Sequence, residues 1–310
     1  MKDIILNENK VLSEKTAVAL GIFDGMHRGH RCVIENVCSF RRDGLKTAVF
    51  TFSSEKILTK HNKPFRYIYK NQQKLDILDE YNIDYICCPE FESVKNMGTA
   101  EFAEKILRGK LNAAKVVCGK RFRFGKNAAG DYRELYELGL EYGFEVIAVP
   151  PVLDGDMTVS SSAVRTLLAD GNIEKANHLL GKNYEIYGEV VYGNQLGRTI
   201  GLPTANIRFS ERQLVPHYGA YASETVIDGK KYLSVTDIGT KPTVENNAEP
   251  LSETHIIDYS GDIYGKKITV ILNRMLRNEM KFSSVEELKN AVNNDIRTVI
   301  NCRGDHGSPA

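Results

Sequence analysis

The sequence has no apolar stretch that could cross a membrane. No run approaches the roughly 18 consecutive apolar residues that a spanning helix needs, and residues 1–12 show neither a long apolar core nor a small-residue cleavage site. We therefore expect no signal peptide, no membrane as a partner and a cytoplasmic location.

Cysteine patterns that would bind a metal are also missing. The six cysteines form no CxxC pair and show no His/Cys spacing typical of a zinc site. In a chain of 310 residues, buried thiols explain them better than a disulfide framework does.

Neither sign of charge is in excess. The 41 lysines and arginines nearly balance the 40 aspartates and glutamates, which argues against nucleic acid as a partner. Small phosphorylated ligands remain compatible with this balance because they need only a few local donors. The sequence gives no oligomeric state.

The first half alternates apolar runs with helical patterns. The runs lie at 16–23, 45–52, 85–88, 115–118 and 144–149, and the helical patterns at 29–40, 70–81, 99–111 and 134–142. Strands separated by helices of this length predict a parallel sheet with crossover connections, hence a doubly wound α/β domain.

The pattern changes near residue 159. Two short helices are expected at 160–168 and 173–180, followed by strands at 185–192, 220–227, 231–235, 254–259 and 267–272 and a helix at 284–300. Asp228-Gly229 predicts a hairpin turn, and Ser283 with Glu286 predicts a capping box for the last helix. These features indicate a small antiparallel β-barrel with a terminal helix. We predict domains at 1–182 and 183–303, with a disordered tail at 304–310.

The first motif carrying chemistry is Gly21-Ile-Phe-Asp-Gly-Met-His-Arg-Gly-His30. It lies where a buried strand ends and a helix begins, so free backbone N–H groups can face anionic oxygens. His27 and His30 are three residues apart and share one helix face. A capping histidine beside a surface histidine is the alternative, but H-x-G-H after a strand and a glycine-rich turn is typical of nucleotidyltransferases.

Two further motifs accompany it. Ser160-Ser-Ser-Ala-Val-Arg165, at another helix start, offers hydroxyls and a guanidinium to the β- and γ-phosphates of ATP. By itself it would be better explained as a serine cap with a solvated arginine, and its pairing with H-x-G-H favours the phosphate role. Phe122 and Phe124, in a glycine-bounded loop after a strand, could form the wall of a flat heteroaromatic site or simply fill the core.

The most specific stretch runs from Gly193 to Asn206. Gly193, Gly197 and Gly201 are spaced by four residues, which lets the backbone approach phosphates closely. Thr204 and Asn206 add two neutral oxygens that suit Mg²⁺. Phosphoryl transfer to an alcohol also needs a base. Glu253 is a candidate, although an isolated glutamate on a strand usually faces solvent.

Taken together, these residues resemble the bacterial bifunctional riboflavin kinase/FMN adenylyltransferase (FAD synthetase) family over residues 17–303. The matching motifs are G-x-F-D-G-x-H-x-G-H at 21–30, F-x-F-G at 122–125, S-S-x-x-x-R at 160–165, L-L-G at 179–181, G-R-x-x-G-x-P-T-A-N at 197–206, I-G-T-K-P-T at 238–243, E-x-H-I-x-D at 253–258, D-I-Y-G at 262–265 and L-R-x-E-x-K-F at 276–282.

The resemblance implies an enzyme that phosphorylates riboflavin to FMN with ATP and Mg²⁺ and adenylylates FMN to FAD. Its residue roles are implied in the same way, with Glu253 as the kinase base and His27 and His30 as catalytic residues of the adenylyltransferase. The ATP and phosphate contacts would be Gly21, Phe23, Asp24, Gly29, Ser161, Arg165, Gly193, Gly197, Arg198 and Gly201; the flavin contacts Phe122, Phe124, Arg277, Glu279 and Phe282; and the metal ligands Thr204 and Asn206.

The sequence departs from the family pattern beside the expected flavin site of the first domain. Residues 53–56 are Ser-Ser-Glu-Lys in place of a proline- and histidine-containing run, and Arg121 stands where an acidic or amide residue is usual. Two alternatives therefore stay open. One is a riboflavin kinase with an impaired or altered adenylyltransferase domain, and the other is a non-catalytic flavin or nucleotide sensor.

Overall fold

A computed structural model describes residues 10–53, 59–60, 63–193, 197, 201–240 and 249–304. Internal contacts divide the chain into two units, one ending at Ser161 and one beginning at Ser162. This division assigns the helices between Ser161 and Leu180 to the second unit, whereas the predicted domain boundary at 182 assigns them to the first. The predicted tail lies outside the described residues beyond Gly304.

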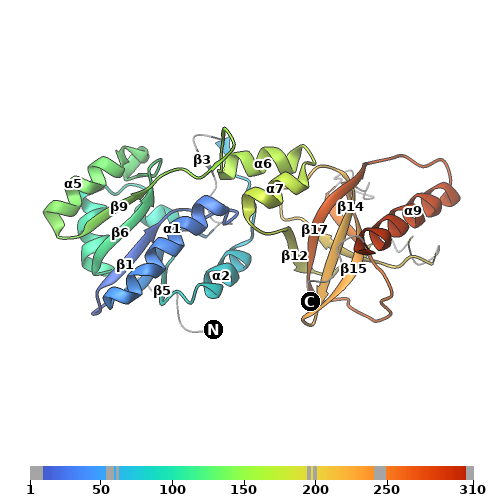
Figure 1. Cartoon of the computed structure of the whole chain (residues 1–310), viewed down its shortest axis with the longest axis horizontal. Coiled ribbons are helices and arrows are strands. Elements are labelled where there is room, and N and C mark those ends of the chain that lie inside the picture. The colour runs from blue at the N-terminus through green and yellow to red at the C-terminus, as the bar shows by residue number, and fades with distance from the viewer. Residues whose placement is uncertain are drawn as a thin grey trace. The chain divides into compact units, whose positions relative to one another are not determined.

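A five-stranded parallel sheet, ordered β5-β2-β1-β6-β9, forms the centre of the first unit (Figure 1). Its strands are β1 (Thr16–Leu20), β2 (Lys46–Phe50), β5 (Tyr85–Cys87), β6 (Ala113–Gly119) and β9 (Glu145–Val149). Its helical segments are α1 (Arg28–Ser39), η1 (Phe40–Asp43), α2 (Asn71–Glu80), α3 (Phe91–Val94), α4 (Thr99–Glu101) with its π-helical continuation η3 (Phe102–Lys110), η4 (Lys126–Ala128) and α5 (Tyr132–Tyr142).

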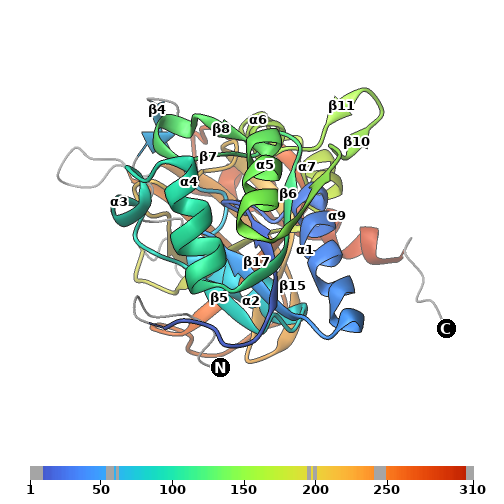
Figure 2. The ribbon, with the colours of Figure 1, turned by 90° about the vertical axis from the view of Figure 1, so that its left-hand side faces the viewer.

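Helices cover both faces of this sheet, so its central strand β1 is buried along its whole length. Figure 2 shows α1 and α4 on opposite sides of the sheet. Phe102 and Leu107 of η3 and Leu135 of α5 belong to one core cluster with Val18 and Val116 of the strands. The predicted doubly wound α/β fold is confirmed. Three small hairpins complete the unit: β3 (Thr59–Lys60) with β4 (Lys63–Pro64), β7 (Arg123–Phe124) with β8 (Gly130–Asp131), and β10 (Leu153–Asp154) with β11 (Met157–Thr158).

The second unit has an antiparallel sheet ordered β12-β17-β14-β15-β16-β13. Its elements are α6 (Ser161–Ala169), which begins at the last residue of the first unit, α7 (Ile173–Leu180), β12 (Tyr184–Glu189), β13 (Thr204–Arg208), β14 (Gly219–Ile227), β15 (Lys230–Thr240), β16 (Pro250–Ile256), β17 (Lys267–Asn278) and α9 (Val285–Gly304). A single bridge between Val191 and Asn206 joins the chain after β12 to β13. Because these are the two outer strands, the bridge closes the sheet into the predicted small barrel.

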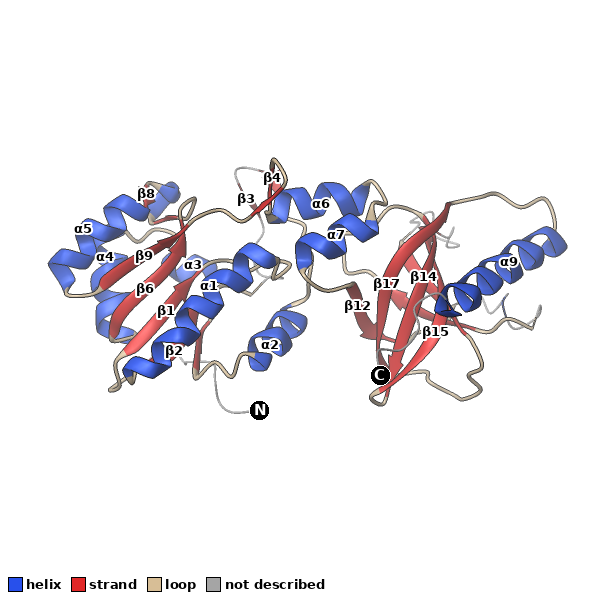
Figure 3. Ribbon diagram, viewed as in Figure 1, coloured by secondary structure: helices blue, strands red, loops and turns tan. Residues whose placement is uncertain are grey.

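The predicted hairpin turn is confirmed by positive φ angles of 48° at Asp228 and 79° at Gly229, between β14 and β15. The terminal helix α9 lies against β14 and β15 (Figure 3), and Val299 joins a cluster with Ala222 and Val235.

The predicted cap of α9 is wrong by one residue. The N–H of Glu287 donates to Ser284 Oγ at 3.1 Å, and the Glu287 carboxylate accepts from the N–H and hydroxyl of Ser283. The helix starts at Val285, so Ser284 is its N-cap and Glu287, not Glu286, is its third residue.

Candidate active sites at the sheet switch point and on the barrel

The H-x-G-H motif and the phenylalanine loop follow neighbouring strands. The strand order reverses direction at β1: β2 pairs with one edge of β1, and β6, which comes later in the chain, pairs with its other edge. Open α/β sheets bind ligands outside the carboxyl ends of the strands at such a switch point. Residues 21–30 follow β1 and residues 120–124 follow β6, so both motifs lie where the topology provides a binding crevice.

His27 and His30 stack on one another, with ring centroids 3.6 Å apart and planes 19° from parallel. His27 also caps α1, because its Nδ1 accepts the backbone N–H of His30 at 3.3 Å. A Cβ on Gly29 would come within 3.2 Å of the His27 ring. His27 therefore caps the helix, as the alternative interpretation expected of one histidine, and it also lies beside His30, as the phosphate-binding interpretation expected.

The turn before α1 has strained backbone angles and is held by a hydrogen bond and by ring contacts. Phe23 and Met26 have positive φ angles of 54° and 44°, a conformation that costs a non-glycine residue about 1–3 kcal/mol and that is common at functional sites. Asp24 is buried and accepts the N–H of Ile68 at 2.9 Å. The Phe23 ring meets the His30 ring edge-on, and a Cβ on Gly21 would come within 2.9 Å of the Phe23 ring.

The segment after β11 returns to this turn. Ser161 donates its hydroxyl to the backbone carbonyl of Asp24 at 3.0 Å, and Arg121 donates to Thr158 Oγ1 at 3.4 Å. Arg28 of the H-x-G-H motif pairs with Asp154 at 3.4 Å. Ser161, a predicted ATP contact, therefore lies against the turn that carries the histidine motif. Arg165 lies one helical turn further along α6, within the second unit, and its phosphate contact stays a prediction.

The two phenylalanines after β6 differ in burial. Their rings stack at 5.9 Å, but Phe124 is 6% exposed and contacts Phe102 in the core, whereas Phe122 is only partly buried. Phe124 therefore fills the core, and Phe122 is the ring with a surface to offer a ligand. Of the departures at 53–56, residues 54–56 lie outside the described residues.

On the barrel, the predicted kinase residues fall in one row across the strands. Asn206 of β13 pairs with Glu253 of β16, Glu253 with Asp237 of β15, Asp237 with Ala220 of β14, and Ala220 with Arg277 of β17. Directly paired residues on antiparallel strands point to the same face. The structure therefore brings the predicted metal ligand, base and flavin contact to one face of the barrel.

Asn206 has an unsatisfied polar atom. The side chain is 3% exposed, and its buried Oδ1 meets no donor among the described residues. Buried polar atoms normally have partners, so an orphan oxygen calls for an explanation such as a bound ion. Gly193 packs against this amide, since a Cβ there would lie 2.7 Å from Asn206 Nδ2. Neutral oxygens from Asn206 and Thr204 fit a magnesium ion completed by phosphates and water.

A cavity of about 370 Å³ lies beside Thr204. Pro203, Tyr259, Asp262 and Tyr264 also contribute to its wall. The D-I-Y-G motif is thereby brought next to the P-T-A-N motif, and the cavity is of a size typical of small-molecule sites.

Gly197 and Leu202 lie close together before β13. The Leu202 N–H donates to the Gly197 carbonyl at 2.8 Å, and a Cβ on Gly197 would come within 2.3 Å of the Leu202 oxygen. Gly201 has a φ of 78°, which favours glycine. Arg198 and the K-P-T part of the motif at 238–243 lie outside the described residues.

Arg277, the last residue of this row across the strands, contacts Asp295 and Phe282. Two nitrogens of Arg277 contact Asp295 Oδ2 of α9, Nε at 3.1 Å and Nη2 at 2.9 Å, and its guanidinium lies 5.6 Å from the Phe282 ring centre. Burial raises the pKa of Asp295, against the opposing pull of Arg277. Glu279 Oε1 lies 2.7 Å from where a Gly239 Cβ would be, so Gly239 gives this carboxylate room.

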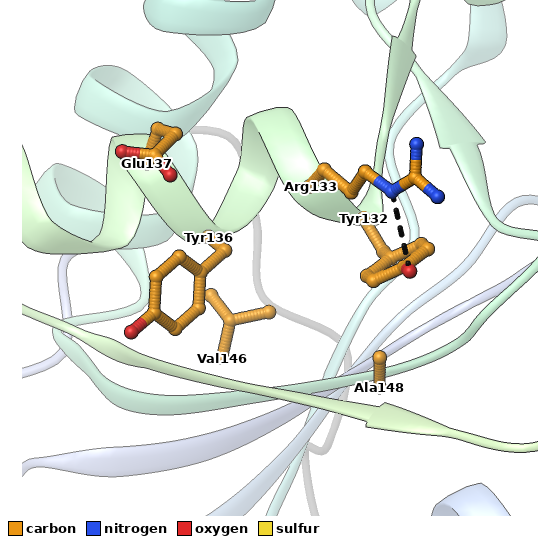
Figure 4. A pocket seen from close by; sticks show the side chains of 6 residues that line it. All are labelled: Tyr132, Arg133, Tyr136, Glu137, Val146 and Ala148. Atoms are coloured by element: carbon orange, nitrogen blue, oxygen red, sulfur yellow. Dashed lines mark hydrogen bonds between the residues drawn. The ribbon is translucent and has the colours of Figure 1, made fainter.

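A second hollow, of about 450 Å³, lies between α5 and the outer strand β9 (Figure 4). Its walls are Tyr132, Arg133, Tyr136, Glu137, Val146 and Ala148, and Arg133 donates to the Tyr132 hydroxyl at 3.4 Å. It contains none of the predicted site residues, so we assign no chemistry to it.

An α/β unit with a nucleotidyltransferase motif, followed by a barrel with a candidate metal site, defines a two-domain nucleotide-using class of protein. The FAD synthetase family model matches residues 9–163, and the riboflavin kinase family model matches residues 180–302. The chain is 37% identical to the bifunctional riboflavin kinase/FMN adenylyltransferase of Escherichia coli K12 over 94% of each chain. It is 34% identical to that of Pseudomonas fluorescens over 89% of each. It belongs to the bifunctional riboflavin kinase/FMN adenylyltransferase family.

A solved structure extends the likeness to the whole fold. A Streptococcus pneumoniae protein described as a macrolide-efflux protein aligns with a TM-score of 0.84 and 28% identity, over 96% of this chain and 99% of its own. In the part of the chain that the structure describes, no helix is both long and apolar enough to cross a membrane.

Proposed function

We propose that the chain converts riboflavin to FMN in its barrel unit and FMN to FAD in its α/β unit, using ATP for both steps. The observation that carries this is that both family models match, one on each half, in a chain whose relatives combine both activities over nearly their full length. Both activities follow from membership of this family, and the residue roles below are our proposals.

In the kinase step, Glu253 takes the proton of the ribityl 5′-hydroxyl as its oxygen attacks the γ-phosphorus of ATP and ADP departs. Thr204 and Asn206 would hold Mg²⁺, which neutralises phosphate charge when bound. Gly193, Gly197, Arg198 and Gly201 are assigned to the phosphates, and Arg277, Glu279 and Phe282 to the flavin. The orphan oxygen of Asn206 beside Glu253 supports this assignment.

In the adenylyl step, a phosphate oxygen of FMN attacks the α-phosphorus of ATP and pyrophosphate leaves. Such a reaction depends on positioning and charge stabilisation rather than on a protein nucleophile. His27 and His30 are assigned to the α-phosphate. Gly21, Phe23, Asp24, Gly29, Ser161 and Arg165 are assigned to the rest of ATP. Phe122 is assigned to the isoalloxazine side, with Phe124 packed behind it in the core.

We place both reactions in the cytoplasm, with small molecules and no nucleic acid or membrane as partners.

One assay separates the candidate functions. Purified protein is given ATP and Mg²⁺ with riboflavin, and separately with FMN, and the flavins are resolved by chromatography. FMN from the first reaction and FAD from the second are expected. FMN without FAD would indicate a kinase with an impaired second domain, and neither product would indicate a sensor.

A further inference from the structure

Lys74 is a buried lysine that no sequence motif identifies. It lies in the first turn of α2 and is only 1% exposed. Its ammonium donates to the backbone carbonyl of Phe52, to Thr51 Oγ1 at 3.3 Å and to the backbone carbonyl of Ile22 at 3.5 Å. Three oxygens of described residues thus accept from this ammonium, which has three N–H donors.

These oxygens belong to two different segments at the carboxyl edge of the sheet. Ile22 lies between β1 and the histidine pair, whereas Thr51 and Phe52 directly follow β2. The hydroxyl of Thr51 also donates to the Ile22 carbonyl at 2.9 Å, and the N–H of Gly21 donates to the Phe50 carbonyl at 3.2 Å. Lys74 therefore sits at the centre of the contacts that join the two segments.

A core position rarely retains a charged lysine. Taking an ammonium out of water is costly, and an apolar residue of similar volume often serves as well or better for stability alone. The side chain lies at the edge where the proposed phosphate-binding turn begins, and its ammonium donates to the carbonyl of Ile22, two positions after β1 ends. The location indicates a role in shaping that turn.

We propose that Lys74 is a positioning residue for adenylyl transfer, because its ammonium fixes the turn carrying His27 and His30 relative to the segment after β2. This inference rests on the assignment of FAD formation to the first unit. FAD formation by the unaltered chain tests that assignment separately, before any variant is made.

The test compares Lys74→Met with Lys105→Met in the full-length protein. Lys105 pairs with Glu101 on the surface at 2.7 Å, with its side chain 62% exposed, and is a matched control for losing a lysine charge. In Lys74→Met, the KM for ATP in FAD formation should rise about tenfold, because small displacements of positioning groups have effects of this order or larger. FMN formation from riboflavin, measured in the same preparation, should stay within about twofold in both variants.

The KM distinguishes positioning from folding. Partial unfolding of the first unit lowers the maximal rate of FAD formation but leaves the KM of the remaining folded enzyme unchanged. A Lys74→Met protein whose KM for ATP matches that of Lys105→Met overturns the proposal.

If Lys74→Met does not fold, Thr51→Val tests the proposal instead. It keeps the lysine but removes the hydroxyl that contacts both Lys74 and the Ile22 carbonyl. A smaller rise in the KM for ATP is expected, and an unchanged KM in this variant also overturns the proposal.

Discussion

Asn206 and Glu253 lie directly opposite each other on β13 and β16, so the orphan amide oxygen and the candidate base share one face of the barrel. Asp237 is the next residue in the same row, on β15. This arrangement places the candidate metal ligand beside the candidate base, as the proposed transfer of a phosphoryl group to an alcohol requires.

Glu253→Gln should therefore abolish FMN formation. The amide keeps the size of the side chain but cannot take the hydroxyl proton, and loss of a general base costs about 10²–10⁴-fold in rate. FAD made from supplied FMN should be unchanged. Glu224→Gln, on β14 of the same barrel, is the control and should retain FMN formation. If Glu253→Gln lost both activities while folded, the assignment of sites to units would be wrong.

Gly193→Ala should weaken the use of Mg²⁺ in the kinase step. The new Cβ would lie 2.7 Å from Asn206 Nδ2, so the amide must move from the candidate metal site. We expect the Mg²⁺ concentration for half-maximal FMN formation to rise about tenfold, by the sensitivity of active sites to small displacements. Gly98→Ala, where a Cβ meets nothing within 4 Å, is the matched control. An unchanged Mg²⁺ dependence in Gly193→Ala would contradict the metal assignment.

His27→Asn should separate the two roles of His27. Asparagine is a good N-cap residue, so α1 keeps its cap while the imidazole stacked on His30 is lost. We expect FAD formation to fall about 100-fold or more, as loss of a preorganised charge-stabilising group does. The thermal midpoint should remain near that of the unaltered protein. His27→Ala should lose the same activity and also about 1 kcal/mol of stability, because it removes the cap. FAD formation that survives in His27→Asn would restrict this residue to capping.

The sequence predicted the α/β unit more fully than the barrel. Buried parallel strands such as β1 and β6 are continuous apolar runs, which a single sequence reveals directly. The strand β13 was not expected, although Ala205 and Ile207 alternate with polar residues, because it is only five residues long and follows a glycine-rich stretch that was read as a phosphate loop.

The boundaries of β15 and β16 were predicted less well for a different reason. The barrel interior there is lined partly by hydroxyls, with Ser223 Oγ 2.8 Å from Thr236 Oγ1 and Thr236 Oγ1 2.9 Å from Thr254 Oγ1. A strand with hydroxyls inside and charged residues outside has no apolar alternation to detect. Lys74 was missed for a related reason, because a lysine on a predicted helix is normally solvated.

Arg277→Lys should weaken riboflavin binding without affecting FAD formation. A lysine cannot reproduce the two contacts that Nε and Nη2 make to Asp295, so the position of α9 and of the Phe282 ring changes. We expect the KM for riboflavin to rise about tenfold, in line with the loss of a hydrogen bond to a charged group. Arg297→Lys, on the exposed side of α9, should leave the KM for riboflavin unchanged. Equal KM values in the two variants would remove Arg277 from the flavin site.

Asp84 should make the first unit sensitive to acid. Burial acts to raise the pKa of its carboxyl, but hydrogen bonds from the Thr47 N–H at 2.9 Å and hydroxyl at 2.8 Å, together with Lys46, lower it below the usual 3.8. A lowered folded-state pKa gives stability that is present above pH 3.8 and is lost as the pH falls through the folded-state value.

The measurement compares thermal midpoints of Asp84→Asn and the unaltered protein at pH 7 and near pH 3. Loss of about 1 kcal/mol of hydrogen bonding should lower the midpoint of the first unit by about 2–4 °C at pH 7. The difference should shrink near pH 3, because below pH 3.8 the carboxyl of the unfolded chain is protonated and folding must then release that proton. Asp43→Asn, at the exposed end of η1, should shift neither value. A deficit of the same size at both pH values would mean that Asp84 acts through its shape and not through its charge.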